Sequence, residues 1–132
     1  MKEEMMSRVV HFEIHADEPE RAATFYKSVF GWEIKKWEGP IDYWLVTTGK
    51  DTEPGIDGAI VKRQGDKHPG MAVIGYVCTV QVDDLDTTIE KATEAGGLVA
   101  LPKGPIPGVG YIAYFLDTEG NVFGILEPSP NA

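Results

Sequence analysis

The chain has 132 residues, of which 42 % are hydrophobic and 25 % charged, a composition that predicts one globular domain over 1–132. An excess of acidic over basic residues gives a formal net charge of −9, which argues against nucleic acid and membrane surfaces as partners. A single cysteine, no signal peptide and no long apolar run together predict a cytoplasmic protein.

The first half of the chain reads as a strand, a helix and three more strands. Residues 8–16 alternate between apolar and polar side chains, which predicts a strand. Asp17 is expected to cap the following helix, whose apolar stripe ends at Gly31. Three further strands are predicted at 32–37, 43–48 and 58–63.

The second half repeats this order. An alternating strand at 75–82 precedes a helix that begins at Asp83 or Asp84 and ends at two glycines, 96–97. Its further strands are predicted at 98–101, 111–116 and 121–127. The predicted organisation is a first βαβββ module, a linker and a second βαβββ module, at 8–63, 64–74 and 75–127. A duplicated unit of this kind favours a ligand cavity between its halves.

Two local features carry their own expectations. Glycines and prolines fill 103–110, which predicts an irregular loop, either a plain connector or a flap over the cavity. Cys78 is expected on the helix-packed face of its strand, as a buried and inert thiol.

Several short motifs carry a family resemblance. They are Phe25-Tyr26, Phe30-Gly31-Trp32, the turn at 117–121 and the strand segments 11–14 and 43–46. With these motifs the chain resembles the vicinal oxygen chelate superfamily of glyoxalase I, extradiol dioxygenases and bleomycin resistance proteins. More narrowly, it looks like the small bacterial and archaeal proteins labelled "related to lactoylglutathione lyase". The resemblance implies an α+β fold in which the modules form a cupped, incomplete eight-stranded mixed barrel. It also implies a ligand in the cup and a homodimer.

The resemblance also implies a divalent metal, and here the sequence departs from the pattern. His11 falls on the first ligand position and is the only match. The equivalent position in the second module is Val77, the usual glutamate falls on Gly124, and 58–63 contains no histidine or acidic residue. We therefore predict no cofactor and no usual metal site, with a divalent metal held through His11 as the disfavoured alternative.

The first strand carries the candidate chemistry. His11, Glu13 and His15 share one face, but on a flat strand they stand about 7 Å apart and do not converge on one ion. His11 and Glu13 are the predicted acid–base pair, because histidine titrates near neutrality and a buried glutamate can be raised toward it. Ordinary hydrogen-bonded polar residues are the alternative interpretation.

The repeat maps the polar face of the first strand onto Thr79 and Gln81 in the second module. Aromatic residues with polar tips complete the expected pocket. Strand alternation allows only one residue of each pair to face it, Tyr43 or Trp44, and Tyr111 or Tyr114. The predicted ligand-binding residues are His11, Glu13, His15, Tyr43, Trp44, Thr79, Gln81 and Tyr111.

These observations predict a glyoxalase-related protein that binds a small organic molecule without the usual metal. A sequestering protein of the resistance type would perform no reaction. The alternative is a metal-dependent lyase, isomerase or dioxygenase that uses His11, and a third is a ligand-sensing module. The fold alone does not choose among them.

Overall fold

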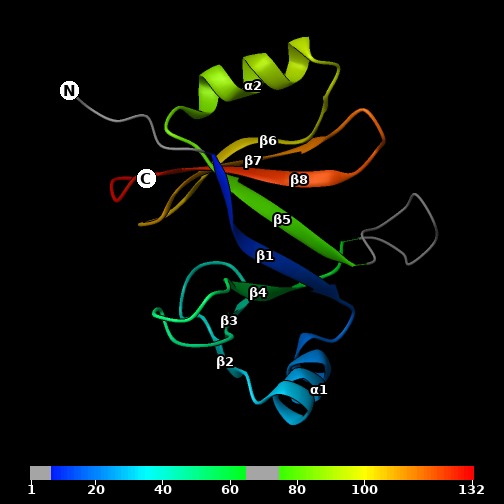
Figure 1. Cartoon of the computed structure of the whole chain (residues 1–132), viewed down its shortest axis with the longest axis vertical. Helices are drawn as coiled ribbons and strands as arrows, with labels where there is room; N and C mark the ends of the chain where they lie inside the picture. Colours follow the sequence, from blue (N-terminus) through cyan, green and yellow to red (C-terminus); the bar gives the residue numbers. More distant parts are fainter. Residues whose placement is uncertain (1–6, 65–74) are drawn as a thin grey trace. The chain divides into compact units, whose positions relative to one another are not determined.

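The computed structural model describes residues 7–64 and 75–132, which form two compact units (Figure 1). One unit is His11–Val77, and the other contains Cys78–Ala132 together with the chain up to Val10. Of the predicted linker, all but Gln64 lies outside the described residues.

The first series of elements is β1 (Arg8–Ala16), α1 (Pro19–Phe30), β2 (Glu33–Lys36), β3 (Tyr43–Thr47) and β4 (Asp57–Lys62). Its strands lie in the order β2-β3-β4-β1, with β1 parallel to β4 and the other neighbours antiparallel. Alternation along β1 directs Phe12 and Ile14 into an apolar core with Ala23 of α1. The helix ends at Gly31, whose φ of 71° suits a residue without a Cβ.

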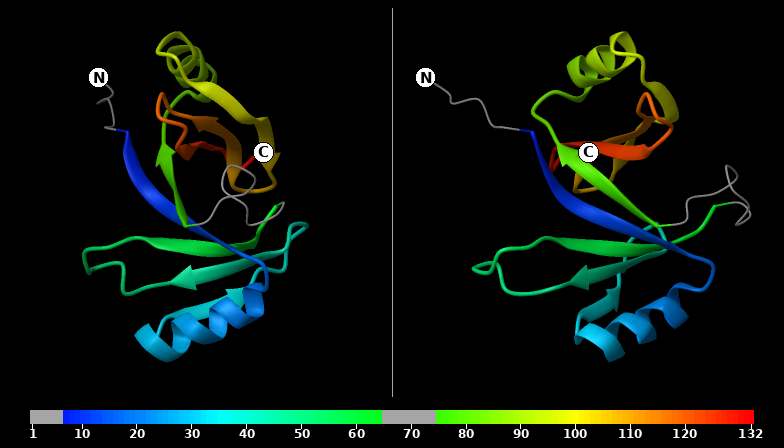
Figure 2. Two further views of the ribbon diagram at one scale, coloured as in Figure 1. Left: turned by 90° about the vertical axis from the view of Figure 1, so that its right-hand side faces the viewer. Right: turned by 45° about the vertical axis from the view of Figure 1, so that its right-hand side comes forward.

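The second series is β5 (Tyr76–Gln81), α2 (Leu85–Glu94), β6 (Leu98–Ile106), β7 (Gly110–Leu116) and β8 (Val122–Pro128) (Figure 2). Its strands lie in the order β5-β8-β7-β6, with β5 parallel to β8. Leu85 of α2 packs with Ala113, Phe115 and Ile125 in a second apolar core. The α+β class and the repeated βαβββ order are therefore confirmed.

The predicted cap of the first helix is wrong. Glu18, not Asp17, occupies the N-cap position of α1, and its side chain makes no capping hydrogen bond. The Asp17 carboxylate instead accepts a hydrogen bond from Arg63 Nη1 at 2.6 Å. In the second series Asp84 is the true cap, because its Oδ1 accepts from the backbone N–H of Thr87 at 3.1 Å.

The loop predicted at 103–110 is largely a strand. β6 continues to Ile106 and pairs with β7, which begins at Gly110, so only the three residues between them form the turn. The prolines are tolerated because β6 is the last strand in its order and pairs on one side only. Register shifts on both sides of Leu101 absorb the remaining irregularity.

Cys78 is exposed, not buried as predicted. The helix of its module packs mainly on β6, β7 and β8 and does not cover Cys78. The sequence pattern gave the correct strand but assumed that its second face lies under a helix.

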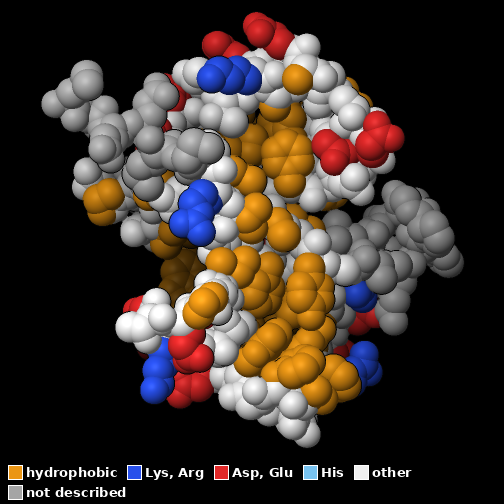
Figure 3. All heavy atoms as spheres, viewed as in Figure 1, with side chains coloured by type: hydrophobic (Ala, Val, Ile, Leu, Met, Phe, Trp, Pro, Cys, Tyr) orange, Lys and Arg blue, Asp and Glu red, His pale blue; other side chains and the backbone are white. Residues whose placement is uncertain are grey.

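Apolar side chains also lie at the surface around α1, as Figure 3 shows. Phe25, Val29 and Phe30 of this helix are each more than half exposed. Among the described residues, no helix has both the length and the apolar character needed to cross a membrane.

Candidate functional site

The polar face of β1 carries a buried carboxylate. His11, Glu13 and His15 alternate with residues of the first core, and Glu13 is only 6 % exposed. In the neighbouring strand β4, the residue opposite Glu13 is Ala59, which is completely buried. A buried charge needs hydrogen-bond partners to offset its lost hydration.

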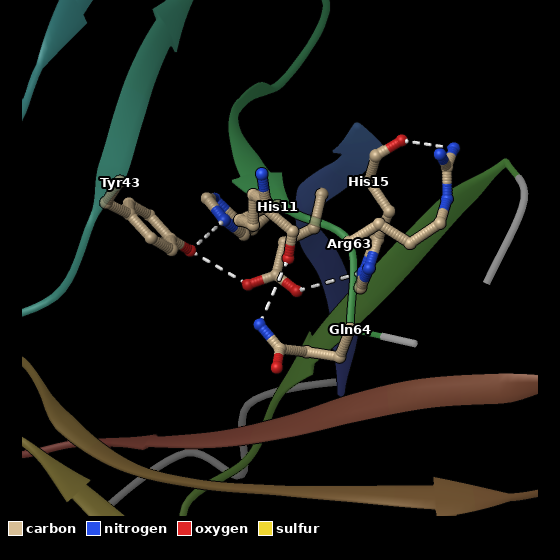
Figure 4. Close-up of polar contacts among 7 residues, drawn as sticks. His11, His15, Tyr43, Arg63 and Gln64 are labelled. Carbon is tan, nitrogen blue, oxygen red and sulfur yellow. Dashed lines mark hydrogen bonds and ion pairs between the residues drawn. The ribbon is translucent and has the colours of Figure 1, made fainter. Parts of the chain in front are cut away.

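Tyr43 of β3 supplies one partner and joins Glu13 to His11. Its hydroxyl donates to Glu13 Oε2 at 2.9 Å and lies 3.1 Å from His11 Nε2 (Figure 4). The His11 and Tyr43 rings are almost parallel, with 4° between their planes. The three side chains come from two strands and form one hydrogen-bonded cluster.

The structure selects Tyr43 over Trp44 for this face. Trp44 points the other way, packs against the first core, and donates its indole N–H to Glu20 of α1 at 2.9 Å. Trp44 is therefore not brought together with His11 and Glu13.

His15 lies on the other side of Glu13 from Tyr43. Its Nε2 lies 3.8 Å from Glu13 Oε1, and its backbone carbonyl accepts a hydrogen bond from Arg63 Nη2 at 2.9 Å. Arg63 directly follows β4, so this hydrogen bond connects the end of β4 to the end of β1. The same guanidinium binds the Asp17 carboxylate. Sequence reasoning missed Arg63 because its partners lie 46 and 48 residues away in the chain.

Both histidines are held toward the neutral form. Burial lowers the pKa of His11 below its usual value of 6.5, although the charges of Glu13 and Asp57 oppose this. Burial also lowers the pKa of His15, with Glu13 opposing and Arg63 reinforcing the shift. A neutral imidazole is the form that accepts a proton or a hydrogen bond.

The residues present do not fit the metal that the family resemblance implies. Within residues 7–64 and 75–132, no three histidine, cysteine or acidic side chains gather closely enough to hold an ion. Asp57 lies opposite His11 in register, but its Oδ1 accepts from the Thr48 backbone N–H at 2.8 Å. The predicted strand began one residue after Asp57, so the sequence did not indicate this neighbour. We assign no chemical step to a metal.

Neighbouring side chains crowd Gly124, the position where the resemblance places a glutamate. Gly124 of β8 lies opposite Thr79 of β5 and Tyr114 of β7. A Cβ at Gly124 would stand 2.9 Å from Thr79 Oγ1 and 3.1 Å from Tyr114 Cε1, too close without a local shift. A larger residue at this position would therefore need the Thr79 or Tyr114 side chain to shift.

The remaining predicted ligand residues lie on the second series of strands. Thr79 is 2 % exposed, and its hydroxyl has no hydrogen-bond partner among the described residues. Gln81 follows on the same face of β5 and is half-buried. Tyr111 packs into the second core, with the Lys103 ammonium 5.1 Å from its ring centre, so Tyr114 is the tyrosine beside Thr79.

Comparison with known families agrees with this architecture. The model of the Glyoxalase/Bleomycin resistance protein/Dioxygenase superfamily matches residues 8–125. The chain belongs to this superfamily. The match covers both βαβββ series except the end of β8, and it includes every residue of the cluster on β1 and β3.

Curated relatives of the chain carry related names. Proteins of Mycobacterium tuberculosis and Mycobacterium bovis named "Putative glyoxylase CFP32" are 33 % identical over 120 residues, which is 89 % of this chain and 43 % of theirs. The chain thus spans less than half the length of these relatives. A "Glyoxylase-like domain-containing protein" of Didymella fabae is 32 % identical over 127 residues, covering 86 % of this chain and 88 % of that protein.

Solved structures share the fold at low sequence identity. A hypothetical protein, BH1468 of Bacillus halodurans, has a TM-score of 0.69 at 12 % identity, covering 97 % of this chain and 99 % of that one. The methylmalonyl-CoA epimerase of Mycobacterium tuberculosis has a TM-score of 0.65 at 16 % identity, covering 92 % and 88 %. A Streptomyces coelicolor methylmalonyl-CoA epimerase in complex with 2-nitronate-propionyl-CoA gives 0.68 at 12 % identity, covering 95 % and 99 %.

Proposed function

We propose that this glyoxalase-superfamily protein binds a small, uncharged carbonyl compound on the polar face of β1, without a divalent metal. The observation that carries the proposal is the partly buried cluster in which the Tyr43 hydroxyl links His11 to the buried Glu13. Such a cluster offers fixed hydrogen-bonding groups at a largely buried position, which is what recognition of a small polar molecule requires.

The charge distribution supports an uncharged ligand. The net charge of −9 and the buried Glu13 carboxylate both disfavour an anion, and burial holds His11 toward its neutral form. Relatives named glyoxylase, and related folds that bind a CoA thioester, direct the ligand search to carbonyl compounds.

The same residues support acid–base chemistry on the bound molecule. His11, held neutral by burial, is the proposed base, and Glu13 is its partner through the Tyr43 hydroxyl. The proton transferred would be one on carbon beside a carbonyl, and the electron pair of the broken C–H bond would pass to the carbonyl oxygen as an enolate. His15, on the same strand face, is proposed as a further ligand contact.

Metal content and ligand binding test the proposal together. Untagged protein is analysed by plasma mass spectrometry, and uncharged aldehydes, ketones and hydroxyketones are titrated with NMR detection, each beside a carboxylate of similar shape. We expect far less than one metal ion per chain, binding of uncharged members, and loss of binding in His11→Gln. Cys78→Ser, a change at an exposed position of β5, is the control and should bind as the unchanged protein does.

Two results would contradict the proposal. One is a stoichiometric divalent ion that disappears in His11→Gln, which would favour the metal-dependent lyase, isomerase or dioxygenase. The other is binding that survives the loss of His11, which would place the ligand elsewhere.

We also propose that the chain forms a homodimer through the exposed apolar face of α1. Phe25, Val29 and Phe30 are more than half exposed there, a pattern typical of surfaces that bind another protein. Sedimentation velocity should give a dimer for the unchanged chain and a monomer for Phe25→Ser combined with Phe30→Ser. Val109→Ser, at another exposed apolar residue, should remain a dimer. A monomer at every concentration of the unchanged chain would refute the interface.

A further inference from the structure

We propose that Tyr43 is a positioning residue that fixes the neutral His11 ring as the Nε2–H tautomer and so presents Nδ1 as the accepting atom. The role of Nδ1 toward a ligand rests on the proposed function, but the tautomer itself can be measured in the ligand-free protein. Nothing in the sequence pattern assigns Tyr43 such a role.

Counting protons in the cluster leads to this tautomer. A carboxylate has no proton to donate, so the single Tyr43 O–H is given to Glu13 Oε2 at 2.9 Å. The phenol oxygen can then only accept from His11 Nε2, which lies 3.1 Å away. A neutral imidazole has one N–H, and with that proton on Nε2 the lone pair is on Nδ1.

The surroundings of the cluster hold this arrangement in place. Glu13 is 6 % exposed, so water competes poorly for the Tyr43 proton. Tyr43 stands on β3, and β4 separates that strand from β1. Ala59 is the β4 residue opposite Glu13, and its single methyl group leaves room for the phenol to reach across.

The other ring nitrogen of His11 is the atom that we propose contacts the ligand. No described residue forms a hydrogen bond with His11 Nδ1. With the tautomer fixed, this atom accepts a hydrogen bond from an O–H or N–H group of a ligand, or takes a proton from carbon. The other tautomer would present a donor at the same place and would favour different ligands.

The tautomer can be read directly by NMR. Long-range ¹H–¹⁵N correlation spectra of the ligand-free protein distinguish protonated from unprotonated ring nitrogens, and His11→Gln assigns the His11 signals. Above the pKa of the ring, we expect Nε2 of His11 in the protonated range and Nδ1 in the unprotonated range. In Tyr43→Phe the acceptor is lost, so both nitrogens should move toward the values of mixed tautomers.

Two further variants separate this role from a merely structural one. Tyr76→Phe removes a phenol from the hydrogen-bonded Tyr26–Tyr76 pair of the same unit, and it should leave the His11 signals unchanged. Glu13→Gln introduces an amide that can donate to the phenol, so Tyr43 can donate to His11 and the Nδ1–H form should appear.

The unchanged protein alone can overturn the inference, whatever the stability of the variants. An Nδ1–H tautomer of His11, or an averaged pair of signals, would refute it, as would unaltered His11 signals in Tyr43→Phe. The expected tautomer combined with no ligand binding would instead contradict the proposed function and leave this inference standing.

Discussion

The two βαβββ series share their order of elements but bury different chemistry on their first strands. β1 buries Glu13 and provides it with the Tyr43 hydroxyl, whereas the equivalent position of β5 buries Thr79 without a described partner. Gly124 adds to this difference, because Thr79 and Tyr114 occupy the space a larger side chain would need. The repeated order of elements therefore does not repeat the buried polar cluster, which lies in the first series.

The largest expected effect comes from moving the carboxylate to the second series. Thr79→Glu would bury a charge at a position that is 2 % exposed, so we expect a loss of about 3 kcal/mol or more in the free energy of unfolding. Urea unfolding followed by circular dichroism measures this. Thr79→Val keeps the shape and should be nearly neutral, and a loss as large as that of Thr79→Glu would show that packing alone is being measured.

The reverse change should cost less. Glu13→Thr leaves the Tyr43 hydroxyl without its carboxylate acceptor, so we expect a loss of about 1–3 kcal/mol in the free energy of unfolding. The matched control is Glu33→Thr, at an exposed position of β2, which should be close to neutral. Equal losses in the two variants would mean that the buried cluster contributes nothing specific.

Acid should weaken the first series through its histidines. The pKa values of His11 and His15 are lowered in the folded state, so the unfolded chain takes up protons first as the pH falls below about 6.5. The two histidines contribute fully to the free energy of unfolding above that pH, and this contribution is lost as the pH falls through their folded-state pKa values. As the pH falls through this range, the free energy of unfolding should decrease more steeply for the unchanged protein than for His11→Gln combined with His15→Gln. Parallel curves would contradict the shifts.

The smallest effect distinguishes the two helices. The Asp84 carboxylate caps α2, and its hydrogen bonds to Thr87 lower its pKa, whereas Glu18 makes no capping hydrogen bond on α1. Asp84→Ala should therefore lower the thermal midpoint slightly, and Glu18→Ala should leave it unchanged. A larger effect at Glu18 would show that the cap difference is wrong.

The sequence by itself determined the strands, the two helices, the duplication and the shared face of His11, Glu13 and His15. These follow from periodicity and from turn residues, which act over a few neighbouring positions. Alternation also narrowed the aromatic candidates to Tyr43 or Trp44, and to Tyr111 or Tyr114. Alternation could not say which residue of each pair faces the cluster, because it places neighbours on opposite faces without showing which face the rest of the chain covers.

Only the tertiary structure made those choices. The register between β1, β4 and β3 brought the Tyr43 hydroxyl to Glu13. Asp17 pairs with Arg63 and does not cap the helix. Pairing with β7 extended β6 through a stretch rich in proline and glycine. Each outcome depends on segments far apart in the chain, so local sequence carries no signal for it, and strand register decided which side chains meet.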